Sequence, residues 1–81
     1  MYYVYALYSV KYKKIYIGFT SNLEQRLSSH NHLLNKGYTA KYKPWIIIYS
    51  EEYINKRTAL LREKQLKPAQ GRAFIKSLIT K

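Results

Sequence analysis

Two tyrosine-rich stretches near the start of the chain, joined by a short connection, limit the fold more than any other feature. Residues 2–9 read YYVYALYS and residues 14–20 read KIYIGFT, and both are rich in residues that favour β-strands. The connection, Val10 to Lys14, is short and basic and contains neither Asn-Gly nor Gly-Gly. The sequence therefore predicts a β-hairpin without predicting its type of turn.

Alternation along the two strands places particular side chains on the same face. Tyr3, Tyr5 and Leu7 share one face of the first strand. Tyr16 and Gly18 share one face of the second. If the register joins these faces, Tyr5 and Tyr16 become neighbours, whereas a slip of one residue separates them. Gly18 has no side chain, so we expect it to leave room there for a ligand or for a helix.

A helix is expected directly after the hairpin. Ser21 followed by Glu24 fits a capping box, in which each side chain satisfies a free backbone N–H group. The helix is predicted to run to about Leu34. Residues 35–43 then form a loop that carries several lysines.

The second half of the chain contains one more strand and two helical segments. The stretch WIIIY, residues 45–49, predicts a buried strand. Asn55 caps a helix that runs to about Lys67, and Pro68 ends it. A last helical segment is weakened by Gly71. The order β-β-α-β-α-α predicts an α+β fold, with one small sheet packed by helices.

Length and charge narrow the class of protein. The 81-residue chain is long enough for one domain, residues 1–81. Fifteen Lys and Arg stand against four Glu, for a formal net charge of +11. Such a charge favours a densely anionic partner, with nucleic acid first and an anionic membrane surface second. The ten tyrosines could stack on bases or bind phosphates, although many of them also fill strands.

Several function classes are excluded by composition. The chain has no cysteine, so it contains neither disulfides nor a thiolate metal site. No apolar run approaches the roughly 20 residues that span a bilayer. The amino terminus lacks the features of a secretory signal, so a cytoplasmic location is expected.

Two polar residues interrupt the apolar stripe of the first predicted helix. At helical spacing, Leu23, Leu27 and Leu34 fall on one face. His30 lies in the middle of that face and Arg26 at its edge. A lone histidine there is usually a satisfied core residue, and an arginine at the edge can turn outward along its own methylenes. The alternative is that both face an anionic ligand.

A single carboxylate breaks the inner face of the next helix. Ala59, Leu60 and Leu66 form that face, and Glu63 lies among them at helical spacing. Glu63 either pairs with a core cation such as Arg26 or serves as the one protein ligand of Mg²⁺. The other carboxylates have ordinary explanations, in the capping box or just after a strand: Glu24, Glu51 and Glu52.

Taken together, these motifs resemble the GIY-YIG domain, specifically its small stand-alone bacterial branch. The first element corresponds to Tyr3-Val4-Tyr5 and the second to Tyr16-Ile17-Gly18. Arg26 with His30 four residues later, and ALLREKQLK around Glu63, follow in the order and spacing of the family. The resemblance spans residues 2 to about 67.

The resemblance implies a three-stranded antiparallel sheet flanked by helices. It also implies cleavage of nucleic-acid phosphodiesters that depends on Mg²⁺ or Mn²⁺, with DNA favoured over RNA as the substrate. Tyr5 and Tyr16 would be the catalytic tyrosines. Of the two we assign Tyr5 as the general base and Tyr16 as the group that positions the water or phosphate, and the reverse assignment stays open. Arg26 would stabilise the phosphate, His30 would support the site, and Glu63 would bind the metal.

The partners follow from the same resemblance and from the charge. Six cations are expected to bind nucleic acid: Lys14, Lys36, Lys41, Lys43, Arg62 and Lys67. A second copy of the chain or a partner protein is expected to supply specificity. Binding to a membrane is not expected, because no helix combines a basic face with an unused apolar one.

The chain departs from the family pattern at two places. Tyr3 stands where the first motif has glycine, and residues 68–81 contain no asparagine, which many active members carry; Gln70 is no clear substitute. The alternative is therefore a nucleic-acid-binding module that keeps the fold without cleaving.

Overall fold

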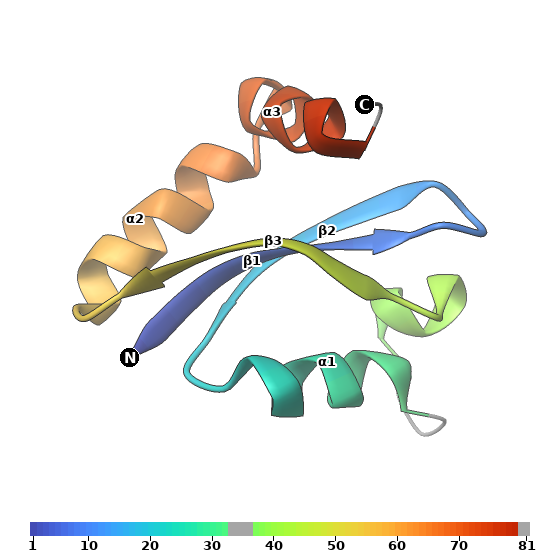
Figure 1. Ribbon diagram of the computed structural model, residues 1–81, viewed down its shortest axis with the longest axis horizontal. Coiled ribbons are helices and arrows are strands. Elements are labelled where there is room, and N and C mark those ends of the chain that lie inside the picture. The colour runs from blue at the N-terminus through green and yellow to red at the C-terminus, as the bar shows by residue number, and fades with distance from the viewer. Residues whose placement is uncertain (33–36, 80–81) are drawn as a thin grey trace.

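The computed structural model describes residues 1–32 and 37–79, which form a small sheet with helices on both faces (Figure 1). In chain order the elements are β1 (Tyr2–Ser9), β2 (Lys14–Thr20), α1 (Leu23–Asn31), the 3₁₀ helix η1 (Tyr38–Tyr42), β3 (Ile46–Tyr53), α2 (Lys56–Leu66) and α3 (Ala69–Ile79). The sheet has three strands, all paired antiparallel, in the order β2-β1-β3. The predicted α+β class and the three-stranded antiparallel sheet are confirmed. None of the described helices is long and apolar enough to cross a membrane.

The hairpin of β1 and β2 has the register that brings the two tyrosine faces together. Tyr5 pairs with Gly18 and Leu7 with Tyr16, so Tyr5 and Tyr16 are diagonal neighbours on one face. The turn is closed by Lys13, whose φ of 55° is left-handed and whose N–H donates to Ser9 at 2.7 Å. Of the two registers that the sequence left open, the structure has the one that makes Tyr5 and Tyr16 neighbours.

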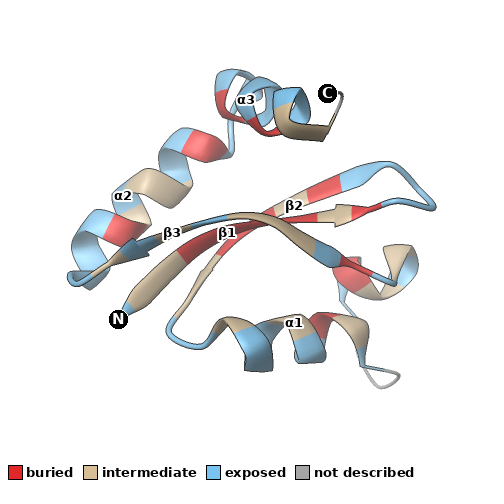
Figure 2. Cartoon of the chain, viewed as in Figure 1, coloured by how far each residue is buried: buried red, intermediate tan, exposed pale blue. Residues whose placement is uncertain are grey.

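Apolar residues pack on both faces of the sheet. One cluster joins β1 and β2 to α2 and α3, through Val4, Ala6, Ile15, Ile17, Ala59, Leu66 and Ile75. The other lies on the α1 side and is built around Tyr5, Leu7 and Trp45. The central strand β1 is therefore buried from both sides along most of its length (Figure 2).

The first helix differs from its prediction at both ends. Its N-cap is Asn22, not Ser21, and the Asn22 side chain accepts a hydrogen bond from the N–H of Gln25 at 3.1 Å. The helix ends at Asn31, earlier than the predicted Leu34, which lies outside the described residues. Within the predicted loop, residues 38–42 form η1, because three residues per turn suit a short connection of this kind.

The third strand is longer and more exposed than predicted. It begins at Ile46 and continues to Tyr53 instead of ending at Tyr49, because its second half pairs with the start of β1. It lies at an edge of the sheet, and Ile46 is 49% exposed, so the isoleucine run does not form a buried strand. The buried residue of the motif is Trp45, just before the strand.

The two helices on the far face meet at a tight junction. The predicted cap is confirmed, since the Asn55 side chain accepts from the N–H of Arg57 at 2.8 Å. Gly71 lies against the end of α2, where a Cβ atom would be 2.3 Å from the Cα of Leu66. Gly71 therefore permits a close approach of α3 to α2.

Candidate active site

A buried polar chain links the sheet to α1 and η1. The hydroxyl oxygen of Tyr5 lies 3.0 Å from Nε2 of His30, and Nδ1 of His30 lies 3.0 Å from Oγ1 of Thr39. All three residues are buried, and Tyr5 is only 1% exposed. His30 therefore occupies the inner face of α1 as predicted, and its two ring nitrogens bind Tyr5 of β1 and Thr39 of η1.

Asn31 and Trp45 hold η1 and the start of β3 next to these three hydrogen-bonded residues. The Asn31 side chain accepts from the N–H of Trp45 at 2.6 Å and donates to its carbonyl at 3.0 Å. The indole N–H of Trp45 donates to the carbonyl of Thr39 at 2.9 Å. The sequence reasoning missed both residues, because these contacts join segments far apart in the chain.

A cavity of about 270 Å³ opens beside the polar chain, between α1, η1 and β2. The ring of Tyr16 lies on its wall, 4.8 Å from the ring of His30 and 6.3 Å from the ring of Tyr5, centroid to centroid. The cavity is lined by Tyr16, Arg26, Ser29, His30, Gly37, Tyr38 and Thr39. Three of the five predicted catalytic residues thus line one cavity, and Tyr5 lies directly behind it.

Gly18 provides the space that the Tyr5 ring occupies. A Cβ atom at Gly18 would lie 2.5 Å from the hydroxyl oxygen of Tyr5 and 3.0 Å from Cε2 of Tyr16. The expectation that Gly18 leaves room for a ligand or a helix is therefore wrong. The glycine makes room for the neighbouring tyrosine.

The charge states around the cavity follow from burial and from Arg26. Burial raises the pKa of Tyr5 to about 12, although a hydrogen bond from Arg26 acts in the opposite direction. The same interaction with Tyr5 raises the pKa of the Arg26 guanidinium, which also interacts with Tyr16. Burial, followed by the charge of Arg26, lowers the pKa of His30. At neutral pH, Tyr5 and His30 are therefore uncharged and Arg26 is charged.

Burial also bears on which tyrosine can act as a base. A neutral imidazole has one donor and one acceptor nitrogen, so Tyr5 and Thr39 take opposite roles in their hydrogen bonds to His30. A phenol with a pKa near 12, sealed behind the cavity, is a poor base at neutral pH. Burial therefore argues against Tyr5 as the general base, an assignment that stays a prediction.

Glu63 lies on α2, on the face of the sheet away from α1, with its side chain 17% exposed. Its carboxylate lies 3.6 Å from Nζ of Lys67, so its ion-pair partner is Lys67 and the alternative pair with Arg26 is not formed. Glu63 is not among the residues that line the cavity. Its negative charge is the smallest of the named causes that act on the pKa of Tyr5.

The described residues suit only a metal that needs few protein ligands. In the described part of the chain, no group of three or more His, Asp or Glu could hold an ion together. Mg²⁺ commonly takes one or two carboxylates and completes its shell with water and substrate phosphates. Glu63 fits that requirement as a single carboxylate in a strongly cationic protein.

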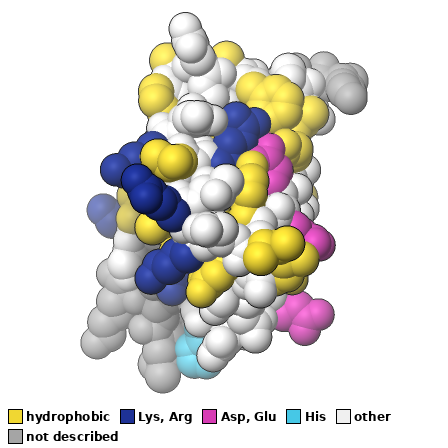
Figure 3. All heavy atoms as spheres, turned by 90° about the vertical axis from the view of Figure 1, so that its left-hand side faces the viewer, with side chains coloured by type: hydrophobic (Ala, Val, Ile, Leu, Met, Phe, Trp, Pro, Cys, Tyr) yellow, Lys and Arg dark blue, Asp and Glu magenta, His cyan; other side chains and the backbone are white. Residues whose placement is uncertain are grey.

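The predicted nucleic-acid-binding lysines have different surroundings. Lys14 lies with its Nζ 5.4 Å from the ring centroid of Tyr42, and Lys41 is exposed on η1. Lys43 donates to the carbonyl of His32 at 3.0 Å. Lys36 lies outside the described residues. On the face shown in Figure 3, Lys and Arg side chains gather on one half while carboxylates lie along the other edge.

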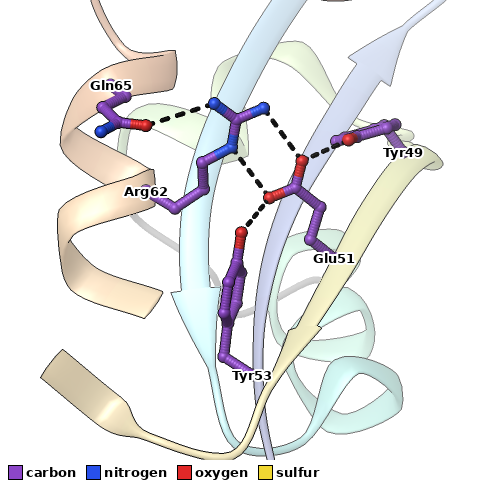
Figure 4. A network of polar contacts seen from close by, with 5 residues as sticks. All are labelled: Tyr49, Glu51, Tyr53, Arg62 and Gln65. Carbon is purple, nitrogen blue, oxygen red and sulfur yellow. Dashed lines mark hydrogen bonds and ion pairs between the residues drawn. The ribbon is translucent and has the colours of Figure 1, made fainter. Parts of the chain in front are cut away.

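Arg62 is engaged within the protein (Figure 4). Its Nε and Nη2 donate to the two carboxylate oxygens of Glu51 at 2.9 and 3.0 Å, and its Nη1 donates to Gln65 at 3.3 Å. The hydroxyls of Tyr49 and Tyr53 donate to the same carboxylate. Arg62 therefore links α2 to β3, and its charge is already paired with a carboxylate.

The sequence reasoning missed this network because it ended the strand too early. Tyr49, Glu51 and Tyr53 are spaced by two residues, so a strand that continues to Tyr53 places all three on one face. Burial alone would raise the pKa of Glu51, but hydrogen bonds from Arg62, Tyr49 and Tyr53 outweigh it and lower the pKa to about 2. Gln70 lies at a separate cavity next to Arg62.

Comparison with known proteins identifies the family. A family model described as the GIY-YIG catalytic domain matches residues 1–75. The chain belongs to the GIY-YIG family. It is 40% identical over 67 residues to the UPF0213 protein CPE1444 of Clostridium perfringens, covering 83% of this chain and 71% of that one. It is 36% identical over 80 residues to a UPF0213 protein of Limosilactobacillus reuteri, covering 96% and 82%.

Family membership defines the general activity. A GIY-YIG catalytic domain is a nuclease domain, so its substrate is nucleic acid, and nucleases of this family generally depend on a divalent metal. A third relative, the UPF0213 protein SH2523 of Staphylococcus haemolyticus, is 35% identical over 63 residues, covering 75% of this chain and 77% of that one. The names of these relatives state no activity. No solved structure matches the chain.

Proposed function

We propose that this GIY-YIG protein is an endonuclease that hydrolyses phosphodiester bonds with Mg²⁺ or Mn²⁺, and that DNA is its substrate. The observation that carries the proposal is the cavity shared by Tyr16, Arg26 and His30, backed by Tyr5. A cation, a hydroxyl and a neutral imidazole around one opening suit a phosphate group that must gain negative charge during the reaction.

The roles of these residues follow from their exposure and charge. Of the two motif tyrosines, Tyr16 is the one on the cavity wall, so its hydroxyl orients the attacking water against the phosphorus. Arg26 interacts with that hydroxyl and neutralises the non-bridging phosphate oxygens. The bond between Tyr5 and His30 fixes the imidazole and holds α1 at its distance from the sheet.

Glu63 is the residue that would hold the metal, and its ion pair with Lys67 would open to let the ion bind. When bound, the ion supplies positive charge to the phosphate and to the departing oxygen. Lys67 would then be released toward the substrate phosphates, which suits its predicted role in nucleic-acid binding.

The second candidate function is a binding module that does not cleave. The pairing of Glu63 with Lys67, outside the cavity lining, is the observation that favours it. In that case Glu63 serves only stability, and removing its charge leaves any function unchanged.

One assay with a matched pair of variants separates the two. The protein is incubated with duplex, single-stranded, flapped and junction DNA in Mg²⁺, Mn²⁺ or EDTA. Glu63→Gln is compared with Glu52→Gln, which removes an exposed carboxylate from β3. For an enzyme, cleavage requires the metal and falls by about 100-fold or more only in Glu63→Gln. A folded Glu63→Gln variant that cleaves at the wild-type rate excludes the metal role.

A further inference from the structure

Three tyrosines that the proposed chemistry does not use form an exposed cluster at one end of the molecule. Tyr12 lies in the hairpin turn, and Tyr38 and Tyr42 lie on η1. The ring centroids of Tyr38 and Tyr42 are 5.1 Å apart, and those of Tyr42 and Tyr12 are 5.5 Å apart. Tyr38 is 54% exposed and Tyr12 is 41% exposed. The cluster, hereafter the tyrosine platform, therefore offers aromatic surface to a partner.

The platform adjoins the active-site cavity through one residue. Tyr38 lines that cavity, and it also lines a second cavity of about 290 Å³ beside the hairpin. The second cavity is bordered by Lys13, Lys14, Ile15, Tyr38, Arg72 and Lys76. A nucleic-acid strand that runs from the active-site cavity past Tyr38 would thus enter a basic cavity.

Cations flank the platform as well. The Nζ atoms of Lys14 and Lys11 lie 5.4 and 5.3 Å from the ring centroids of Tyr42 and Tyr12. Arg72 donates to the carbonyls of Lys67 and Ile15 at 3.1 and 3.2 Å, both of which are neutral acceptors. Neither bond pairs the charge of Arg72 with a carboxylate, so that charge can attract phosphates.

Exposed aromatic rings among cations match the needs of a strand with unpaired bases. Each base has a flat face that can stack on a tyrosine, and such stacking contributes about 1–3 kcal/mol per base. In a duplex these faces are covered by neighbouring base pairs. The plain structural alternative is that the rings only fix the hairpin against η1, but that role does not require Tyr38 to be half exposed at the rim of the cavity.

We infer that the tyrosine platform stacks on unpaired bases next to the bond that is cut, while the basic cavity holds the phosphates that lead away from it. The inference rests on the proposed function, and it names the substrate class: a nucleic-acid strand with unpaired nucleotides at the cleavage site. Tyr38 is the central residue, because it is the platform residue that touches both cavities.

Binding to an abasic strand isolates the contribution of the bases. Fluorescence anisotropy in EDTA measures the affinity for a labelled strand of about 12 nucleotides and for an abasic strand of equal length, which keeps every phosphate. We expect the wild type to bind the normal strand about fivefold to 100-fold more tightly. Tyr38→Ala should remove most of this preference and Tyr38→Phe should keep it. Tyr3 lies at the other end of β1, so Tyr3→Ala should leave the preference for the normal strand unchanged.

The outcomes separate this inference from the nuclease assignment. Equal affinity of the wild type for both strands overturns the inference, as does a preference that persists in a folded Tyr38→Ala variant or tighter binding to a duplex of the same length. Metal-dependent cleavage would still stand in each of those cases. A base preference that depends on Tyr38 supports the inference, even if cleavage itself is absent.

Discussion

The hydroxyl of Tyr5 and Nε2 of His30 are 3.0 Å apart in the interior, and this bond joins the central strand of the sheet to α1. It explains why a histidine and an arginine lie on the side of α1 that faces the sheet. The histidine makes a hydrogen bond with the buried Tyr5 hydroxyl, and the arginine lines the cavity beside it. The α1 side of the sheet is thus a polar site with apolar borders.

Alkaline pH should test the buried state of Tyr5. The folded pKa of about 12 lies above the unfolded value of 10.0, so the unfolded chain loses this proton first as pH rises. The resulting stability is complete below pH 10.0 and is lost between there and about pH 12, by up to about 3 kcal/mol. Urea unfolding of the wild type and Tyr5→Phe from about pH 8 to 12 measures it. Parallel pH profiles for the two proteins would contradict the prediction.

Gly18→Ala should disturb the site from within. The new methyl group would lie 2.5 Å from the Tyr5 hydroxyl and 2.6 Å from its Cζ atom, so the ring must move away from His30. We expect a loss of about 1–3 kcal/mol in unfolding free energy, typical of overpacked interiors. The double variant with Tyr5→Phe should lose less than the sum of the single variants, because it removes one clashing atom. Strict additivity would show that the two positions do not interact.

Glu51→Gln should weaken the junction between β3 and α2. The carboxylate receives hydrogen bonds from Arg62, Tyr49 and Tyr53, and we expect a loss of about 1.5–3 kcal/mol at neutral pH. Its pKa of about 2 lies below the unfolded value of 4.5, so this stability is present above pH 4.5 and disappears as pH falls through about 2.

The measurement for Glu51 is urea unfolding at neutral pH and near pH 3, with Glu52→Gln as the matched control. The exposed Glu52 should change stability by less than about 0.5 kcal/mol. The difference between wild type and Glu51→Gln should shrink at the lower pH. A difference that is the same at both pH values would mean that the network does not stabilise the charged form.

Removing one hydroxyl at a time should separate the two site tyrosines. Tyr16→Phe takes away a group on the cavity wall, so we expect cleavage to fall by about 100-fold with little change in melting temperature. Tyr5→Phe removes the buried hydrogen bond between Tyr5 and His30, so we expect a loss of about 1–3 kcal/mol in stability. Gel-based cleavage rates and thermal melts measure the two effects. Loss of cleavage in Tyr5→Phe, with cleavage kept in Tyr16→Phe, would favour Tyr5 as the base.

The sequence predicts the parts of this fold that depend on local patterns. Alternation and a short connection predict the hairpin, and helical spacing identifies His30 and Arg26, whereas the register that joins the faces of Tyr5 and Tyr16 is known only from the structure. Contacts between distant segments are not visible in such patterns. The hydrogen bonds between Asn31 and Trp45 are contacts of this kind, and so is the packing of the Tyr5 ring against Gly18.

Near misses have a different physical cause. Ser21 and Asn22 both have side chains suited to capping, and only the path of the chain after β2 decides between them. Glutamate has a low propensity for β-strands, so the two glutamates of β3 lead to the prediction that the strand ends before them. Pairing with β1 and the ion pair to Arg62 override that propensity.

The strand β2 fixes a length within the molecule. Lys14 begins the strand beside the tyrosine platform, and Tyr16 stands two residues later on the cavity wall. A paired strand rises about 3.3 Å per residue, so these two positions are set about 7 Å apart by the backbone. That is close to the step between phosphates of an extended single strand. If the tyrosine platform binds the strand and Tyr16 acts where it is cut, β2 sets the distance between these two points, and lengthening β2 should shift the position of the cut.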